Sequence, residues 1–222
     1  MNGSINTKRA LVLFSGGQDS TACLAWALNN FDEVIAFTFD YDQRHKIELI
    51  QALKICKMLD VEQETMKIDI FSQLSENSLT HDLEITPGTN SKLPSTFVPG
   101  RNLVFLSLAA AKAYQLGIKD IVIGVCQTDY SGYPDCRENF IKSMEKTISL
   151  SMDTEFRIHT PLMFLSKGET VLMMNDLGKL DWLKETHTCY EGKRPACGKC
   201  PACLLRLKGF EEAGIQDPLA YS

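Results

Sequence analysis

A short loop near the start of the chain carries the residue types that bind an anion. It reads Ser15-Gly16-Gly17-Gln18-Asp19-Ser20-Thr21. Its adjacent glycines let the backbone turn sharply and bring bare N–H groups close to a ligand. The hydroxyls of Ser15, Ser20 and Thr21 add further donors. The loop therefore predicts an anion site, and a nucleotide phosphate is the favoured occupant. The alternative is an ordinary turn with incidental glycines.

Four cysteines near the end of the chain have the spacing of a metal site. They follow the pattern Cys189-x7-Cys197-x2-Cys200-x2-Cys203. Four thiolates suit tetrahedral zinc, and a site filled by protein ligands leaves no position for a reacting water. The pattern predicts a structural zinc. Three closely spaced cysteines can also hold an iron–sulfur cluster, and a disulfide pair is the third alternative.

Two cations lie at predicted helix starts, where the helix dipole disfavours positive charge. Arg101 follows Pro99-Gly100, and Lys167 lies in a first turn opened by the capping box of Ser166 and Glu169. A phosphate or carboxylate partner would offset this cost for each cation. The alternative for both is a side chain exposed to solvent.

The segment 126–137 is the second stretch rich in polar side chains. Aromatic rings there can stack on a planar ring system, and carboxylates can accept from its N–H groups. Ordinary turn chemistry accounts for Gly132 and Pro134 but not for the density of the other groups. They are Asp129, Tyr130, Ser131, Tyr133, Asp135 and Arg137.

The elements that must position these groups alternate along the chain. Short apolar runs predict strands at 10–14, 33–39, 64–68, 120–125 and 157–162. Helical spacing predicts a helix after the first strand and others at 48–59, 102–116, 138–151, 166–177 and 204–211. Alternating strands and helices indicate an α/β fold with a parallel sheet, whose ligands bind beyond the carboxyl ends of the strands. Residues 79–99 show no period and are either a lid or a surface excursion.

Length and charge limit the class of protein. The 222 residues suffice for one large α/β domain, expected at 8–180, with a zinc-binding segment at 181–222. The net charge of −5 argues against broad binding to a nucleic-acid backbone. No apolar run is long enough to cross a membrane, and residues 1–9 lack the hydrophobic segment of a signal peptide. We expect a cytoplasmic protein with no nucleic-acid or membrane partner.

Together these motifs resemble the 7-cyano-7-deazaguanine (preQ0) synthase family of the N-type ATP pyrophosphatase (PP-loop) superfamily. The resemblance rests on FSGGQDST, YDQRH, FVPGRN, QTDYSGYPDCR, THTCYEG and CGKCPAC, and extends from about Arg9 to about Gly214. It implies an adenine-nucleotide alpha-hydrolase-like (Rossmann-like) fold, with a parallel five-stranded sheet flanked by helices. It also implies structural zinc, ATP with Mg²⁺, ammonia and 7-carboxy-7-deazaguanine as reactants, and a homodimer.

The chemistry implied by this family begins with activation of a carboxylate, whose direct leaving group would be oxide. Transfer of AMP supplies a better leaving group, ammonia then gives an amide, and a second adenylation allows dehydration to the nitrile. The loop amides, with Ser15, Ser20 and Asp19, would hold the pyrophosphate end with magnesium. Arg101 and Lys167 would balance the developing charge. We expect nucleotide contacts from Phe14, Ser15, Gly16, Gly17, Gln18, Asp19, Ser20, Thr21, Ala22, Cys23 and Leu24. We expect substrate contacts from His45, Asp129, Tyr130, Ser131, Asp135 and Arg137.

Two points stay open at this stage. His45 and Asp135 are both candidates for the base that activates ammonia. A different PP-loop enzyme that modifies tRNA or amidates another substrate is the alternative function, although the acidic charge disfavours a basic RNA-binding face. A zinc-knuckle binding module that uses the nucleotide as a switch is a further alternative.

Overall fold

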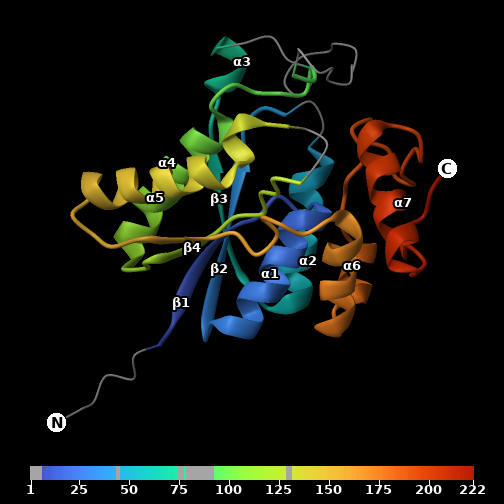
Figure 1. Ribbon diagram of the computed structural model, residues 1–222, viewed down its shortest axis with the longest axis horizontal. Coiled ribbons are helices and arrows are strands. Elements are labelled where there is room, and N and C mark those ends of the chain that lie inside the picture. Colours follow the sequence, from blue (N-terminus) through green and yellow to red (C-terminus); the bar gives the residue numbers. More distant parts are fainter. Residues whose placement is uncertain (1–6, 44–45, 75–77, 79–92, 129–131) are drawn as a thin grey trace.

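The computed structural model describes residues 7–43, 46–74, 78, 93–128 and 132–222. Strands and helices alternate along these residues, as the sequence predicts (Figure 1). Short 3-10 helices are labelled η. In chain order the elements are β1 (Arg9–Leu13), α1 (Gln18–Asn30), β2 (Glu33–Asp40), α2 (Ile47–Leu59), β3 (Glu62–Lys67), α3 (Phe71–Leu74), α4 (Arg101–Leu116), β4 (Asp120–Val122), η1 (Pro134–Cys136), α5 (Glu138–Ser151), β5 (Arg157–His159), α6 (Lys167–Asp176), η2 (Leu180–Lys184) and α7 (Pro201–Ala213).

The strands form one five-stranded sheet in the order β3-β2-β1-β4-β5, and all of its pairs are parallel. This confirms the predicted fold class. The chain moves outward from β1 through β2 to β3 and then crosses to β4 on the other side of β1. Such a reversal leaves a crevice beyond the carboxyl ends of the strands.

Two strands are shorter than the sequence suggests. β4 ends at Val122 because the chain then passes against the start of α1, where a Cβ on Gly124 would lie 3.3 Å from the Asp19 carbonyl carbon. β5 ends at His159, two residues before Pro161, which has no N–H to donate to a strand ladder.

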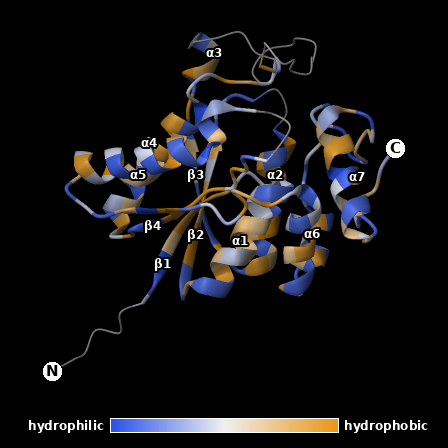
Figure 2. Cartoon of the chain, viewed as in Figure 1, coloured by the Kyte–Doolittle hydropathy of each residue, from blue (hydrophilic) through white to orange (hydrophobic). Residues whose placement is uncertain are grey.

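The apolar residues of β1 divide between the two faces of the sheet. Leu11 and Leu13 pack with α4 and α5, whereas Ala10 and Val12 pack with α1, α2 and α6. This alternation follows from the two-residue period of a strand. Figure 1 shows the two helical layers, and Figure 2 shows polar residues along their outer sides. Because helices cover both faces, ligands reach the sheet from its end.

The last helix packs closely on α6. A Cβ on Gly209 would lie 2.6 Å from the Lys167 Cβ, and one on Gly168 would lie 2.9 Å from the Glu212 Cβ. Glycines at both positions let the two helices approach. Phe210 is buried with the side chains of α1 and α6. The predicted division at residues 180 and 181 stays a prediction, and this contact ties the C-terminal segment to the larger α/β unit.

A buried arginine joins α7 to the segments on either side of it. The Arg206 guanidinium makes two bonds to the Asp217 carboxylate, at 2.7 and 2.8 Å. It also donates to the Thr186 hydroxyl and to the Leu183 carbonyl. Arg206 is 1% exposed, so these acceptors replace the water that its charge loses on burial.

We predict that Arg206→Met lowers the free energy of unfolding by about 3–5 kcal/mol, because it leaves the buried Asp217 charge without its partner. Denaturant unfolding followed by circular dichroism measures the change. Lys208→Met on the same helix is the control, since its pair with Glu212 is exposed and contributes less than about 1 kcal/mol. Equal stability of the Arg206 variant and the wild type would contradict the role of this network.

Among the described residues, no helix combines the length and apolar character needed to span a bilayer.

Candidate functional site

The loop after β1 is shaped by its own side chains and by α2. Gly16 has a φ of +80°, and a Cβ there would lie 2.6 Å from the Ala52 nitrogen and 2.8 Å from the Glu48 carbonyl oxygen. Only glycine fits this backbone and this approach. The Ser20 and Thr21 hydroxyls both donate to the Gly17 carbonyl, so they stabilise the turn in this structure.

α1 begins at Gln18, directly after this turn. The first N–H groups of a helix have no acceptor within it, and its dipole favours a negative ligand. Gly17 is the N-cap and provides no side-chain cap. The predicted order of strand, glycine turn and helix is therefore present, with the anion-binding end of α1 at the carboxyl end of the sheet.

Asp19 and Lys167 meet at this end of α1. The Lys167 Nζ lies 2.6 Å from Asp19 Oδ2, although the two residues are far apart in sequence. The other carboxylate oxygen, Oδ1, is buried and has no hydrogen-bond partner among the described residues. A buried acceptor without a partner is costly. This oxygen fits a cation or a ligand donor at the phosphate loop.

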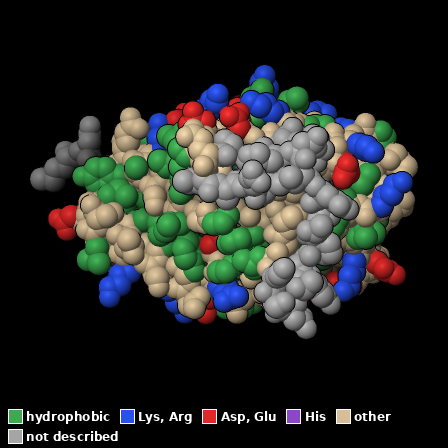
Figure 3. All heavy atoms as spheres, turned by 90° about the horizontal axis from the view of Figure 1, so that it is seen from above, with side chains coloured by type: hydrophobic (Ala, Val, Ile, Leu, Met, Phe, Trp, Pro, Cys, Tyr) green, Lys and Arg blue, Asp and Glu red, His purple; other side chains and the backbone are tan. Residues whose placement is uncertain are grey.

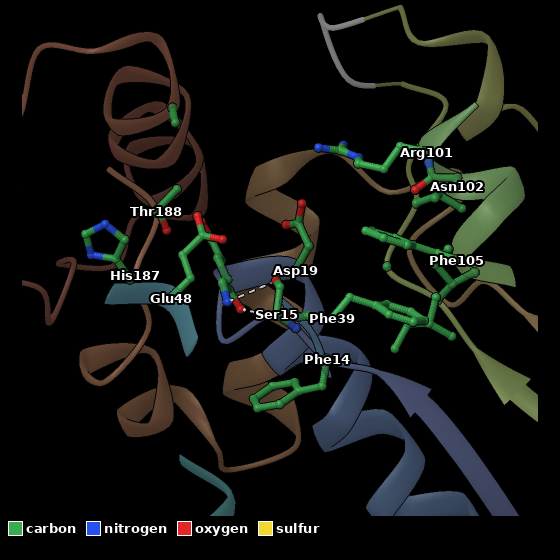
Figure 4. Close-up of a pocket in the computed structure, with 18 of the residues that line it drawn as sticks. Phe14, Ser15, Asp19, Phe39, Glu48, Arg101, Asn102, Phe105, His187 and Thr188 are labelled. Carbon is green, nitrogen blue, oxygen red and sulfur yellow. Dashed lines mark hydrogen bonds between the residues drawn. The ribbon is translucent and has the colours of Figure 1, made fainter. Parts of the chain in front are cut away.

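A cavity of about 350 Å³ opens beside the loop. Its lining includes eight of the predicted site residues: Phe14, Ser15, Gly17, Gln18, Asp19, Ser20, Arg101 and Lys167. Figure 3 views the molecule from above, with hydrophobic side chains near the centre and charged ones around the edge. Figure 4 shows Asp19 and Arg101 reaching into the cavity from different elements. The structure thus brings the predicted phosphate-loop residues and both predicted cations together.

Arg101 enters the cavity from the first turn of α4. Burial alone would lower its pKa, but the nearby Tyr41, Tyr133 and Asp135 outweigh burial and hold the pKa above its usual value. Phe105, one turn further along α4, stacks on Phe39 with ring centroids 4.3 Å apart. Arg101 therefore stays positive above an aromatic wall, which suits a planar anionic ligand.

Glu48 is a second acidic side chain in the cavity, and the sequence analysis missed it. It lies in the first turn of α2 and lines the same space as Asp19. Burial raises its pKa to about 7, and the charge of Arg101 opposes this rise. The only sequence signal was its place just after the polar loop that follows β2, where the cavity of a parallel sheet is expected.

Tyr190 is another residue that the sequence analysis missed. It lies one residue after Cys189 and lines the cavity. Burial raises its pKa well above its usual range, with Arg101 acting in the opposite direction. Its phenol therefore stays protonated and can donate a hydrogen bond within the cavity.

Some predicted site residues lie elsewhere. Asp135 is buried, and its carboxylate accepts from the Asn102 N–H at the start of α4, 3.1 Å away. Arg137 is exposed and lies 3.5 Å from the Gly132 carbonyl oxygen. Neither is part of the cavity lining, and their contacts with substrate stay predictions. The same holds for Gly16, Thr21, Ala22, Cys23 and Leu24 as nucleotide contacts, since they too lie outside the lining.

Four of the six predicted substrate contacts cannot be placed. His45, Asp129, Tyr130 and Ser131 lie outside the described residues, as does 79–92, most of the predicted lid or surface excursion.

The four tail cysteines converge as their spacing predicts. Their sulfur atoms all lie within 4.8 Å of one another, and every one of these residues is buried. The Cys197 and Cys203 sulfurs are 3.9 Å apart. Ligands about 2.3 Å from a tetrahedral zinc would lie about 3.8 Å apart, so this cluster fits a metal ion. The Lys199 and Cys200 amides point at the Cys197 sulfur, as in a metal knuckle.

The cysteine segment is attached to the phosphate loop. The His187 N–H donates to the Gly16 carbonyl at 3.0 Å. The His187 imidazole bonds to the Cys189 carbonyl, so it adjoins the cluster without belonging to it. Thr188 and Tyr190, on either side of Cys189, both line the cavity. Order in the tail therefore bears directly on the shape of the site.

A comparison with protein families identifies the chain. The family model described as "Queuosine biosynthesis protein QueC" matches residues 9–214. This range includes the phosphate loop, the cavity and all four cysteines. The chain belongs to the QueC family.

Relatives of this QueC protein are similar over nearly their whole length. This chain is 52% identical to the 7-cyano-7-deazaguanine synthase of Laribacter hongkongensis. The alignment covers 99% of this chain and 97% of that protein. The chain is 53% identical to the enzyme of the same name from Chromobacterium violaceum, over 96% and 93%. The Bacillus subtilis enzyme of that name is 52% identical, over 92% and 94%.

More distant solved structures share the QueC fold alone. One is a predicted subunit of a tRNA methyltransferase from Methanocaldococcus jannaschii, with a TM-score of 0.50 at 18% identity over 77% of this chain and 74% of that one. Another is a U34-tRNA thiolase from Methanococcus maripaludis with its [4Fe–4S] cluster. Its TM-score is 0.51 at 16% identity, over 94% of this chain and 65% of that one.

Proposed function

We propose that this QueC protein is a 7-cyano-7-deazaguanine synthase, an ATP-dependent ligase that forms carbon–nitrogen bonds. Its substrates would be 7-carboxy-7-deazaguanine, ammonia and ATP. The observation that carries this proposal is the single cavity in which the phosphate loop, Asp19, Lys167 and Arg101 meet. Full-length relatives that bear the synthase name support the choice of substrate.

The reaction needs adenylation because a carboxylate cannot expel oxide. The N–H groups at the start of α1 would hold the pyrophosphate end of ATP. Lys167 and Arg101 would stabilise the negative charge that develops as the substrate oxygen attacks the α-phosphate. AMP is then the leaving group when ammonia attacks the activated carboxyl carbon. A second round on the amide oxygen allows loss of AMP and a proton, which leaves the nitrile.

Two metals fit the residues present. Asp19 would hold Mg²⁺ with the phosphates, because its buried Oδ1 has no hydrogen-bond partner among the described residues and carboxylate oxygens suit this ion. Bound magnesium would neutralise the charge of the pyrophosphate group. The four buried cysteines would hold one structural zinc, since four thiolates leave no open position. An iron–sulfur cluster is the alternative for these thiolates.

The aromatic wall near Arg101 supports binding of a planar base. Phe39 and Phe105 are stacked within the cavity lining, and Tyr41 packs against Phe105 with centroids 5.5 Å apart. Such rings favour flat, conjugated ligands. The proposal also includes substrate contacts from the segment 129–137. It further includes a cytoplasmic location and a homodimer.

Release of AMP tests the proposal. With ATP, Mg²⁺ and ammonium present, AMP should form only when 7-carboxy-7-deazaguanine is added. A tRNA-modifying enzyme would instead need tRNA for AMP release, and a nucleotide-switched binding module would release no AMP with the acid. Either of those outcomes would overturn the assignment.

A further inference from the structure

We propose that Glu48 is the base that takes a proton from ammonium in the amide-forming step. At neutral pH ammonia is present almost entirely as ammonium, which has no free electron pair. An enzyme that uses ammonium as a nucleophile must therefore first remove a proton from it. This inference rests on the proposed synthase function and adds a residue to its mechanism.

Glu48 is placed beside the phosphate loop by α2. Its backbone packs against Gly16, where a Cβ would lie 2.8 Å from the Glu48 carbonyl oxygen. Its side chain lines the cavity with Asp19 and Arg101. Figure 4 shows this side chain on the same side of the cavity as Thr188, opposite Arg101. The carboxylate therefore faces the space in which an activated substrate would lie.

The two acids that line the cavity have different surroundings. Asp19 is ion-paired with Lys167, 2.6 Å away, and lies at the start of α1, which suits a cation or phosphate site. Within the described residues, no hydrogen bond or ion pair to the Glu48 carboxylate is found. Two acids whose environments differ in this way commonly divide the roles of stabilising charge and moving protons.

Groups from three other segments face Glu48. Arg101 from α4 carries a positive charge that lowers the Glu48 pKa. The Glu48 charge in turn raises the pKa values of Tyr41 and Tyr190. Burial is the largest influence and raises the Glu48 pKa to about 7. A carboxylate with a pKa near the working pH is ionised often enough to accept a proton and basic enough to take one.

The other candidates for this base are less well placed. Asp135 lies outside the cavity lining, and its carboxylate accepts from the Asn102 N–H. His187 has its imidazole bonded to the Cys189 carbonyl. His45 lies outside the described residues. Among the described acids and histidines of the lining, Glu48 is the one that could accept a proton without first breaking a hydrogen bond or ion pair.

Protons and electron pairs balance in this step. The Glu48 carboxylate takes one proton from ammonium, which gives neutral ammonia and a carboxylic acid. The ammonia electron pair forms a C–N bond to the acyl-adenylate carbon, the C–O bond to AMP breaks, and its electron pair leaves with AMP. The nitrogen loses a second proton to solvent, which leaves the amide. Glu48 then returns its proton to solvent.

Glu48→Gln tests the proposal because glutamine keeps the shape but is not basic. With ammonium at pH 7, we expect a loss of about 100-fold in kcat/KM for ammonium. The rate of acyl-adenylate formation should stay within about threefold of the wild-type rate. Pyrophosphate–ATP exchange in the absence of ammonium measures this rate. With hydroxylamine, which is already neutral at this pH, both proteins should form the hydroxamate at similar rates.

The pH dependence provides a second readout. Wild-type kcat/KM for total ammonium should rise with pH only until Glu48 is ionised, near pH 7. The variant depends on free ammonia and should keep rising, so its defect should shrink roughly tenfold per pH unit above neutrality. Glu48→Asp keeps a carboxylate and should keep the wild-type profile at a lower rate. Glu62→Gln, an exposed acid on β3, is the matched control.

An equal loss with ammonium and hydroxylamine would mean that Glu48 binds the substrate or maintains the site, and would overturn the proposal. A constant defect across pH would do the same. If wild-type protein releases no AMP with the acid substrate, the proposed synthase function itself fails, which distinguishes the two failures.

Discussion

Asp19→Asn should lower the rate of AMP formation by about 10²–10³-fold while the fold stays intact. The side chain lies in the first turn of α1, with Oδ2 paired to Lys167 and Oδ1 buried without a partner among the described residues. Replacing the charged oxygen by an amide removes the group that would hold a magnesium-bound phosphate. Losses of this size follow removal of one electrostatic contact to a transition state. AMP release and pyrophosphate formation measure the effect.

Thermal melting separates this loss from unfolding. Asp60→Asn is the matched control, because Asp60 caps α2 far from the cavity lining and has a φ of 54°, which asparagine tolerates. It should melt and turn over like the wild type. Normal turnover by the Asp19 variant would show that the phosphate loop works without this carboxylate.

Cys200→Ser should remove most of the bound metal and lower the melting temperature by roughly 10 °C. A structural metal supplies folding energy, on the order of 10 kcal/mol in isolated zinc peptides. Much of the α/β unit folds around other contacts, so a loss of about 3 kcal/mol is the reasonable scale for this chain. Elemental analysis should find about one zinc per wild-type chain, whereas iron with sulfide would identify the cluster alternative.

The same substitution should weaken ATP binding, because the tail contacts the phosphate loop through the His187 N–H and the Gly16 carbonyl. Cys126→Ser is the control, since that buried thiol lies near the Thr128 hydroxyl and outside the cluster of four cysteines. It should keep its metal and its melting temperature within a few degrees. A Cys200→Ser protein that melts normally but is inactive would indicate a chemical role for this cysteine instead.

The features of this protein that sequence predicts well are local ones. The backbone of the turn after β1 requires glycine at position 16. The strand before the turn is buried and therefore consists of apolar residues, so both features can be recognised in the sequence. The cysteine spacing specifies a knuckle whose ligands are near neighbours in the chain. Because these constraints act within a few residues, the order of elements and the convergence of the four cysteines could be predicted.

The parts that escaped prediction depend on distant segments meeting. In the sequence, Glu48 is simply the first acid of an amphipathic helix. It becomes enclosed in the cavity only because α4 and the tail pack near the start of α2. Arg206 is one cation of a basic helix until Asp217 and Thr186 surround it. The hydrogen bond from the Asn102 N–H to the Asp135 carboxylate joins two segments that the sequence gives no reason to pair, and substrate binding by Asp135 stays a prediction. Side-chain type alone does not separate these roles.

The mass of the product made from ¹⁵N-ammonium tests the central claim most directly. The protein would be incubated with 7-carboxy-7-deazaguanine, ATP, Mg²⁺ and labelled ammonium, and the products separated and weighed by mass spectrometry. We predict a nitrile that contains one ¹⁵N atom, with two molecules of AMP released for each nitrile and a labelled amide appearing before it. Absence of any labelled deazaguanine product, or AMP release that does not depend on the acid, would contradict it.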